Sequence, residues 1–292
     1  MSQPPLVTLI AGPTASGKSA LALKMARETG AVIINADSQQ LYADLRILTA
    51  RPTVEEEAQA DHRLYGVADA ADAWSVGRWS RAAIELLAAL EAEDRPAILV
   101  GGTGLYFTAL TKGLADIPTV PTNVRNAVEA DFVEKGEVTF RDALAGVDPK
   151  AASTIEKGDR QRLVRAMSVY VSSGRAISDW QADTLPLLKS GAWTGIVIEP
   201  DRQRLYEKCD RRVDTMLENN VLDEVRTLIA RQLPSSLPAM KAVGIRELAA
   251  CLMGEETQGD AVVSLKRATR NYAKRQLTWF RNQAPFWNRI RN

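Results

Sequence analysis

The residues most able to do chemistry stand near the start of the chain, in the run GPTASGKS at positions 12–19. This run matches the phosphate-binding pattern G-x-x-x-x-G-K-[ST] at each fixed position. Glycines let such a loop wrap around a phosphate, with N–H groups pointing inward at a helix N-terminus. The pattern indicates a diphosphate or polyphosphate ligand, and it leaves open whether a phosphoryl group moves. The predicted ligand-binding residues are Gly12, Pro13, Thr14, Ala15, Ser16, Gly17, Lys18 and Ser19, with Lys18 on the phosphate oxygens and Ser19 toward Mg²⁺.

Two further polar residues follow apolar runs that read as strands. Asp37 comes directly after residues 31–36, where a carboxylate could hold Mg²⁺, accept a proton from an acceptor nucleophile, or cap a helix. Thr103 follows residues 97–100 and two glycines, where its hydroxyl could bind an acceptor or a phosphate, or cap a helix at 104–112. Both residues are therefore candidates for the reacting site.

The elements that must position these residues alternate between strand and helix patterns. Helical stretches such as 76–93, with Ser75 placed to cap it, separate the strand-like runs. This alternation predicts a parallel sheet with right-handed crossovers, whose ligands bind at the carboxyl ends of the strands. We therefore expect the phosphate loop, Asp37 and Thr103 to converge. The predicted strands are 6–11, 31–36, 97–100 and 195–198.

The pattern changes after Gly113, where residues 114–122 carry two prolines. From there to about 189 the sequence is helical and charged, and the sheet resumes at 194–198. The predicted fold is α/β, a parallel sheet of the P-loop NTPase-like type flanked by helices, with a helical insertion domain. Residues 1–118 and 190–292 would form the catalytic core with C-terminal basic helices, and 119–189 the insertion. Residues from 201 to the end are predicted to be helical throughout.

Composition excludes several classes of function. The net charge is +1, so the molecule as a whole is not a polycation. A nucleic-acid site would therefore need basic residues clustered in one place. The single histidine, His62, argues against histidine metal clusters and Ser-His-Asp catalysis. Cys209 and Cys251 lack metal-ligand spacing, so we expect structural thiols in a reducing cytosol. With no leader pattern and no run near the ~20 apolar residues of a membrane span, we expect no membrane attachment.

The last part of the chain, residues 261–292, carries eight basic residues and no Asp or Glu. On a helix over 265–281, basic residues fall on one arc, and Leu265, Trp279 and Phe280 lie on the other side. This pattern predicts an apolar face that docks and an outward basic face for a phosphate backbone, although a plain solvated surface is the alternative. The basic residues are Lys266, Arg267, Arg270, Lys274, Arg275, Arg281, Arg289 and Arg291.

Eight motifs in order along nearly the whole chain resemble the tRNA dimethylallyltransferases of the bacterial type: GPTASGKS, DSQQLY, LTARP, HRLYGVAD, GGTGLY, DRQRLVRAM, KAVGIRE and AKRQLTWFR. That resemblance implies transfer of a dimethylallyl group from dimethylallyl diphosphate to N6 of the adenosine 3′-adjacent to the anticodon. It implies Mg²⁺ as cofactor, diphosphate as product and a monomeric enzyme. The chain departs from the family pattern at Ala43, Leu48 and Arg51, the last of which preserves a lysine's charge.

The resemblance also assigns roles to residues. Lys18, Asp37 and Thr103 would be catalytic, with Asp37 the general base on N6, and Arg51 would help the phosphate loop to bind diphosphate. The insertion would clasp the anticodon stem-loop. Residues matching tRNA-binding segments are Asp37, Ser38, Gln39, Gln40, Thr103, Arg125, Gln161, Arg162, Leu163, Val164, Arg165, Lys241, Ala242, Val243, Gly244, Ile245 and Arg246, to which the basic helix adds Lys266, Arg270 and Lys274.

Three other functions remain open from the sequence. A small-molecule or nucleotide kinase shares the loop, and an adenylate isopentenyltransferase shares the transfer chemistry, but neither explains the basic tail and the insertion. An RNA-binding protein with a non-catalytic loop would not need Lys18, Ser19 and Asp37 intact.

Overall fold

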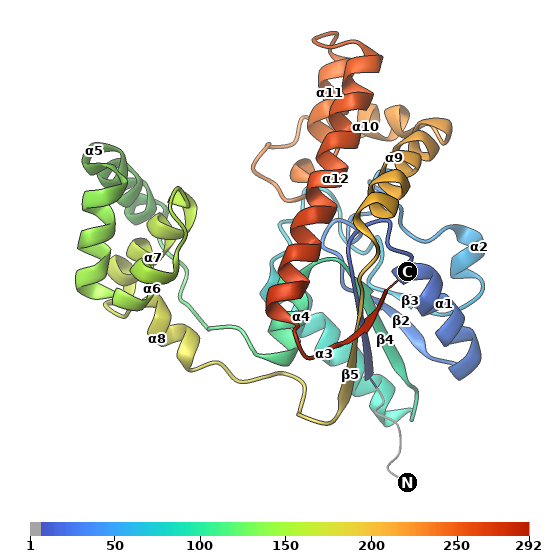
Figure 1. The fold of residues 1–292 in the computed structure, drawn as a ribbon, viewed down its shortest axis with the longest axis horizontal. Helices are drawn as coiled ribbons and strands as arrows, with labels where there is room; N and C mark the ends of the chain where they lie inside the picture. The colour runs from blue at the N-terminus through green and yellow to red at the C-terminus, as the bar shows by residue number, and fades with distance from the viewer. Residues whose placement is uncertain (1–6, 292) are drawn as a thin grey trace. The chain divides into compact units, whose positions relative to one another are not determined.

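The computed structural model describes residues 7–291, which divide into two compact units (Figure 1). One unit contains residues 1–111 and 187–292, and the other residues 112–186. The sequence placed the boundaries of the second unit at 119–189. The shift at the first boundary arises because the extended residues 112–121 have no apolar periodicity that would mark them as part of a helical unit.

The first unit is built on a parallel sheet with the strand order β3-β2-β4-β1-β5-β6 within the described residues. The central strands are runs of aliphatic residues buried on both faces, as expected for a parallel sheet covered by helices. The four predicted strands and the P-loop NTPase-like fold class are confirmed. The strands are β1 (Val7–Ala11), β2 (Val32–Asn35), β3 (His62–Arg63), β4 (Ala97–Gly101), β5 (Trp193–Ile198) and β6 (Asn288–Ile290).

The prediction that the chain is helical from 201 to its end is wrong for β6. This strand pairs in parallel with β5, and the Glu199 N–H donates to the Ile290 carbonyl at 2.8 Å. Its residues are mostly exposed and lack a strand-like apolar pattern. Pairing with the edge of the sheet, rather than local propensity, therefore determines its conformation.

Alternate residues of the strands divide the core into two layers. Ile10, Ile33 and Ile98 pack with helix α1 (Lys18–Thr29), whereas Leu9, Ile34 and Leu99 face the layer that contains Trp79 and Phe107 from two other helices. Ser75 caps the helix that contains Trp79, as predicted, and its side chain accepts a hydrogen bond from the Arg78 N–H. The helices outside α1 are α2 (Val54–Glu57), α3 (Val76–Ala92), α4 (Gly104–Thr111), α9 (Arg202–Glu218), α10 (Val221–Ala230), the 3₁₀ helix Ala239–Lys241, α11 (Ile245–Leu252) and α12 (Gln258–Gln283).

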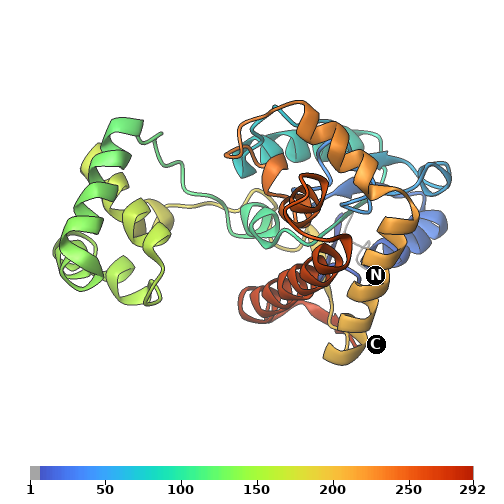
Figure 2. The same cartoon turned by 90° about the horizontal axis from the view of Figure 1, so that it is seen from above.

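Helix α12 is the longest element of this unit and packs beside α9 and α4 (Figure 2). Leu265, Ala273 and Phe280 are buried along one stripe, as the sequence pattern predicts for a docked face. Its Gln276 hydrogen-bonds to the loops that follow β1 and β4, so the helix passes the carboxyl ends of these strands.

The second unit is helical in its described residues, with α5 (Thr122–Val147), α6 (Pro149–Thr154), α7 (Arg160–Ser173) and α8 (Ile177–Ala182) around a small core. Asp148 is buried between these helices. Its carboxylate accepts from the Ala151 N–H at 2.9 Å, from the Ser178 N–H at 3.0 Å and from the Ser178 Oγ at 2.6 Å. One carboxylate thus begins α6 and fixes the start of α8.

Replacing Asp148 by Ala should destabilise residues 112–186 by about 2 kcal/mol, because it leaves buried donors without an acceptor. Hydrogen exchange on the full chain should then show faster exchange within 112–186 and unchanged exchange in the sheet. Ser153→Ala removes an exposed hydroxyl from α6 and is the matched control. Equal protection in the two variants would contradict this role for Asp148.

Within the described residues, no helix is both long and apolar enough to cross a membrane.

Candidate active site at the carboxyl ends of the strands

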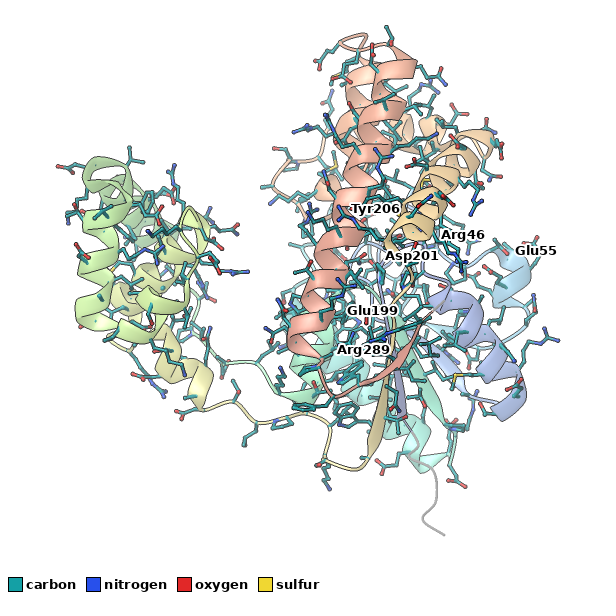
Figure 3. All side chains as sticks on the ribbon, in the orientation of Figure 1. Arg46, Glu55, Glu199, Asp201, Tyr206 and Arg289 are labelled. Atoms are coloured by element: carbon teal, nitrogen blue, oxygen red, sulfur yellow. The ribbon has the colours of Figure 1, made fainter. Side chains whose placement is uncertain are left out.

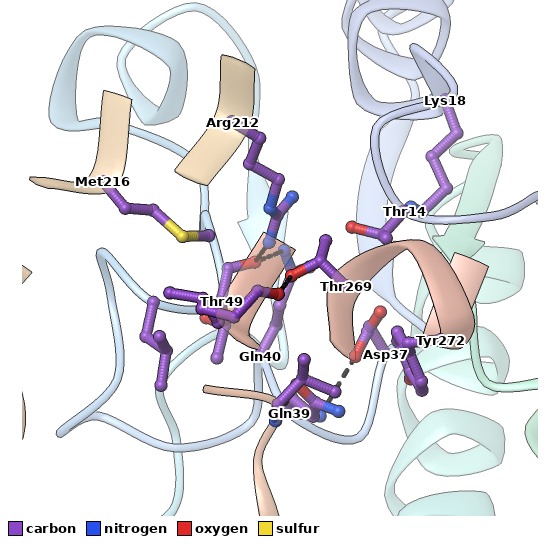
Figure 4. Close-up of a pocket in the computed structure, with 13 residues that line it drawn as sticks. Thr14, Lys18, Asp37, Gln39, Gln40, Thr49, Arg212, Met216, Thr269 and Tyr272 are labelled. Atoms are coloured by element: carbon purple, nitrogen blue, oxygen red, sulfur yellow. Dashed lines mark hydrogen bonds between the residues drawn. The ribbon is translucent and has the colours of Figure 1, made fainter. Parts of the chain in front are cut away.

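A pocket opens where β1, β2 and β4 end, as the sequence analysis expected (Figure 4). It brings together Thr14 and Lys18 from the phosphate loop, Asp37 from the loop after β2, and Val243 from the loop before α11. Its walls come from both ends of the chain. The lining residues are Thr14, Lys18, Asp37, Gln39, Gln40, Leu48, Thr49, Arg212, Met216, Val243, Leu265, Thr269 and Tyr272.

The phosphate loop is crowded at Gly12 and turns through a left-handed conformation at Gly17. A Cβ on Gly12 would lie 3.0 Å from Ser16 Oγ and 3.1 Å from the Ile198 carbonyl oxygen. Gly17 has a φ of 91°, which L-residues rarely adopt, and α1 begins at the next residue. The loop therefore ends at a helix N-terminus, where unpaired N–H groups favour an anion.

Lys18 is held inside this loop, with its Nζ donating to the Pro13 carbonyl at 3.3 Å. Burial lowers the pKa of Lys18 to about 8, the Asp37 carboxylate opposes this change, and the Arg212 guanidinium adds to it. Part of the lysine population is therefore neutral near pH 8 without a ligand. A bound diphosphate would favour the charged form and raise this pKa again.

Asp37 is fixed by Asn35, the last residue of β2. Asn35 Oδ1 accepts from the Asp37 N–H at 2.7 Å, and Asn35 Nδ2 donates to the carbonyls of Asp37 and Leu64. The indole of Trp79 donates to the Asn35 carbonyl at 2.9 Å. Sequence reasoning missed Asn35, although a buried amide at the end of an aliphatic strand is the signal that could have found it.

The carboxylate of Asp37 does not cap a helix. Its Oδ1 accepts from the Gln39 N–H at 3.0 Å within a turn, and its Oδ2 has no hydrogen-bond partner among residues 7–291. Asp37 is 7% exposed and lines the pocket. The carboxylate therefore has one oxygen held by the protein and one available to a ligand.

Thr103 holds the same loop rather than capping α4. Its Oγ1 accepts from the Ser38 N–H at 2.9 Å and donates to Ser38 Oγ at 3.2 Å. Gln39 and Gln40 are also engaged, because Gln39 Oε1 accepts from the Val243 N–H and Gln40 Nε2 donates to the carbonyls of Thr49 and Ala50. The predicted segment 37–40 is thus rigidly attached on three sides.

Arg212 of α9 is a pocket residue that the sequence analysis did not find. Its guanidinium donates to the Thr49 carbonyl at 2.7 Å (Figure 4). Burial lowers the pKa of Arg212, and the Asp37 carboxylate opposes the change. In the sequence, Arg212 stands within a charged helix rich in arginine, so no spacing distinguishes it from its exposed neighbours.

Gln276 of α12 connects the phosphate loop to the loop after β4. Its Oε1 accepts from the Thr14 N–H at 2.8 Å, and its Nε2 donates to the Gly102 carbonyl at 2.9 Å. A Cβ on Gly102 would lie 2.0 Å from Gln276 Nε2, and one on Gly104 would lie 2.3 Å from the Trp279 ring. The motifs GGTGLY and AKRQLTWFR are therefore two halves of one packed contact.

Of the predicted diphosphate ligands, Thr14 and Lys18 line this pocket, whereas Arg51 and Ser19 contact other parts of the structure. The Arg51 guanidinium packs on Gly66, donates to the Tyr42 carbonyl at 3.3 Å and lines an adjoining pocket together with Arg212 and Met216. Ser19 is exposed and borders a small separate pocket with Tyr65. The structure thus does not bring Arg51 or the Ser19 hydroxyl into the pocket of Lys18 and Asp37.

The expectation of a free basic face on α12 is wrong for three of its residues, Lys266, Arg270 and Arg281. Lys266 pairs with Asp214 and Arg270 with Asp210, both at 2.6 Å, because α9 supplies the acids that the tail lacks. Arg281 and Arg289 share Glu199, and Figure 3 labels Glu199 and Arg289. Arg267, Lys274 and Arg275 are exposed and form no ion pair within residues 7–291.

The other residues predicted to contact tRNA form a buried group and an exposed group. Leu163 and Val164 lie in the core of the second unit, and Ala242, Gly244 and Ile245 are buried in the first. These five residues pack inside the protein, and their contact with RNA stays a prediction. The exposed members are Arg125, Gln161, Arg162, Arg165, Lys241 and Arg246.

Known proteins that resemble this chain point to one family. The IPP transferase family model matches residues 40–283. A tRNA dimethylallyltransferase from Caulobacter sp. (strain K31) is 56% identical over 284 residues, which are 97% of this chain and 92% of that protein. This chain belongs to the IPP transferase family.

Solved structures of similar proteins share the fold of this family member. The full-length tRNA isopentenylpyrophosphate transferase from Bacillus halodurans is 31% identical, with a TM-score of 0.70 over 98% of this chain and 89% of that chain. A eukaryotic dimethylallyltransferase solved acting on tRNA has the same fold, with a TM-score of 0.82 and 23% identity over 98% of this chain and 73% of its own. The predicted family is confirmed.

The affinity of the pocket for inorganic diphosphate should fall as pH rises through about 8, because the Lys18 ammonium with its lowered pKa loses its proton there. Calorimetric titrations between pH 6.5 and 9.5 would measure this loss. Diphosphate itself also titrates in this range, so the Lys18→Arg variant, which keeps its charge, is the reference. Parallel pH curves for the wild type and Lys18→Arg would contradict the assignment.

Proposed function

We propose that this chain transfers a dimethylallyl group from dimethylallyl diphosphate to N6 of the adenosine 3′-adjacent to the anticodon of tRNA, with release of diphosphate. The observation that carries the proposal is a carboxylate with an available oxygen, Asp37, in the same pocket as Lys18 and Arg212. Such a pocket suits a reaction in which the acceptor loses a proton and the donor loses an anionic leaving group. The names and the identities of the relatives support the same reaction.

The cationic side of the pocket serves the leaving group. As the bond from the allylic carbon to oxygen breaks, negative charge grows on the diphosphate, and the Lys18 ammonium, the Arg212 guanidinium and the loop N–H groups stabilise it. Because these groups are partly buried and already oriented, their interaction with the developing charge is stronger than in water. Lys18 and Arg212 are thus the anion-binding residues of the reaction.

Magnesium fits this donor set as a companion of the diphosphate. The Ser19 hydroxyl is exposed and has no hydrogen-bond partner among residues 7–291, and the same residues contain no cluster of three acidic, histidine or cysteine ligands. Mg²⁺ commonly keeps several waters and takes one or two protein oxygens beside substrate phosphates. Because Ser19 borders a separate pocket, we propose that the diphosphate and water would supply most ligands of the ion, which would neutralise leaving-group charge.

Asp37 serves the acceptor. The N6 lone pair of adenine is delocalised into the ring, so the amine attacks only as the allylic carbon becomes electron-deficient, and its proton must leave as the bond forms. Asp37 Oδ2 is the oxygen with no partner among the described residues, and Asn35 and Gln39 hold the residue in place. An adenine turned out of its stack into the pocket would present N6 to this oxygen.

The partner surface of the first unit would lie beside the pocket. Lys241 and Arg246 are exposed next to the pocket residue Val243, and Lys274 is exposed on the helix that supplies Tyr272. Positive side chains in these places suit the phosphate backbone of a folded RNA. Because one chain supplies all the described pocket residues, we propose that a monomer suffices.

The Asp37→Asn variant should lose at least ~100-fold in single-turnover transfer, because the amide cannot take the N6 proton. The assay follows label from dimethylallyl diphosphate into unmodified tRNA with Mg²⁺, and filter binding of tRNA should change little. Normal transfer on bound tRNA would exclude Asp37 as the base. Label appearing on free AMP would favour the adenylate enzyme, and ATP consumed with a small acceptor would favour a kinase.

Reversing the charge of Arg267, Lys274 and Arg275 should weaken tRNA binding and flatten its dependence on salt, by about 0.9 in slope for each phosphate that the variant no longer neutralises. The measurement is log Kd against log salt for the full chain. Arg81→Glu, an exposed change on α3, is the matched control. An unchanged slope in the triple variant would place the RNA elsewhere.

A further inference from the structure

The phosphate loop has fewer free donors than its sequence suggests. Pro13 has no backbone N–H, and the Thr14 N–H already donates to Gln276 Oε1 at 2.8 Å. Thr14 is 5% exposed and Gln276 is also 5% exposed, so this bond is shielded from water. The Ser16 N–H also donates, to the Pro13 carbonyl at 3.3 Å, so the N–H groups left for an anion are those of Ala15, Gly17 and the start of α1.

The Gln276 amide is fixed in this orientation from both ends. A backbone N–H can only donate and a carbonyl can only accept, so the bonds to Thr14 and Gly102 determine which amide atom faces which loop. The absence of a Cβ on Gly102 gives the amide its space, since that Cβ would lie 2.0 Å from Nε2. A ligand that needs the Thr14 N–H would have to break its buried hydrogen bond to an amide that Gly102 holds in place.

From this geometry we infer that Gln276 is a specificity-determining residue, which makes the loop accept a diphosphate and reject the third phosphate of a triphosphate. The inference rests on the proposed function, in which the loop binds a prenyl diphosphate. Loops of this sequence pattern otherwise bind nucleoside triphosphates. Here Gln276 accepts the hydrogen bond from the N–H of Thr14, the residue after Pro13, and α12 covers that side of the loop.

The charges in the pocket act in the same direction. Lys18 and Arg212 are the two cationic side chains that line it, and the Asp37 carboxylate opposes them. A third phosphate adds negative charge without a further cation or a free Thr14 N–H to receive it. Its desolvation would then remain uncompensated.

The test is calorimetric titration of the full chain, without tRNA and with Mg²⁺, by inorganic diphosphate and by inorganic tripolyphosphate. The wild type should bind diphosphate at least ~10-fold more tightly, the size of one charge-assisted hydrogen bond. Gln276→Met keeps the side-chain length, removes both hydrogen bonds and should lower this preference about tenfold by freeing the Thr14 N–H. Gly102→Ala should act in the same way by displacing the amide.

The control variant is Thr278→Met, an exposed change two residues further along α12, which should keep the wild-type ratio. A partly unfolded variant lowers the titrated stoichiometry for both ligands but leaves the ratio of the two Kd values unchanged. A wild type without preference, or a ratio unchanged in both Gln276→Met and Gly102→Ala, would overturn the inference and leave the proposed function standing. Diphosphate binding that is absent, or unaffected by Lys18→Met, would overturn both.

Discussion

The side-chain amide of Gln276 is the interaction on which the arrangement of the site depends. It joins the phosphate loop, the loop after β4 and the last long helix through two short hydrogen bonds in a buried place. Because α12 also supplies Thr269 and Tyr272 to the pocket, the same amide sets the distance between the phosphate loop and the opposite wall. Gly102 leaves space for the Gln276 amide, and Gly104 leaves space for the Trp279 ring of the same helix.

The charges of the pocket tolerate burial because they neutralise one another. Desolvation lowers the pKa of Lys18 and of Arg212, and in each case the Asp37 carboxylate is the largest opposing influence. Burial also raises the pKa of Tyr272, and the Asp37 charge adds to this rise, so its hydroxyl stays protonated beside the site. One carboxylate thus offsets part of the charge of the two cations, and the pocket keeps a net positive charge for a diphosphate.

The sequence predicted the sheet and the convergence of the phosphate loop with Asp37, because aliphatic runs mark buried parallel strands and their carboxyl ends meet at one edge. It did not predict the roles of Asn35 and Arg212, which depend on what the fold places opposite them. The free basic face on α12 was wrong at Lys266, Arg270 and Arg281 because the acids that pair with them lie on other elements. Asp214 and Asp210 are on α9, and Glu199 follows β5. β6 was missed because pairing with β5 compensates for its weak local pattern.

The bond between Thr14 and Gln276 spans 262 positions of the chain. Synthesis proceeds from the N-terminus, so the ribosome makes the phosphate loop long before the helix that completes it. Contacts at such separation form late, because the entropy of closing the loop must be offset first. A nascent chain therefore carries an open phosphate loop for most of its synthesis, and the loop closes only after α12 has emerged.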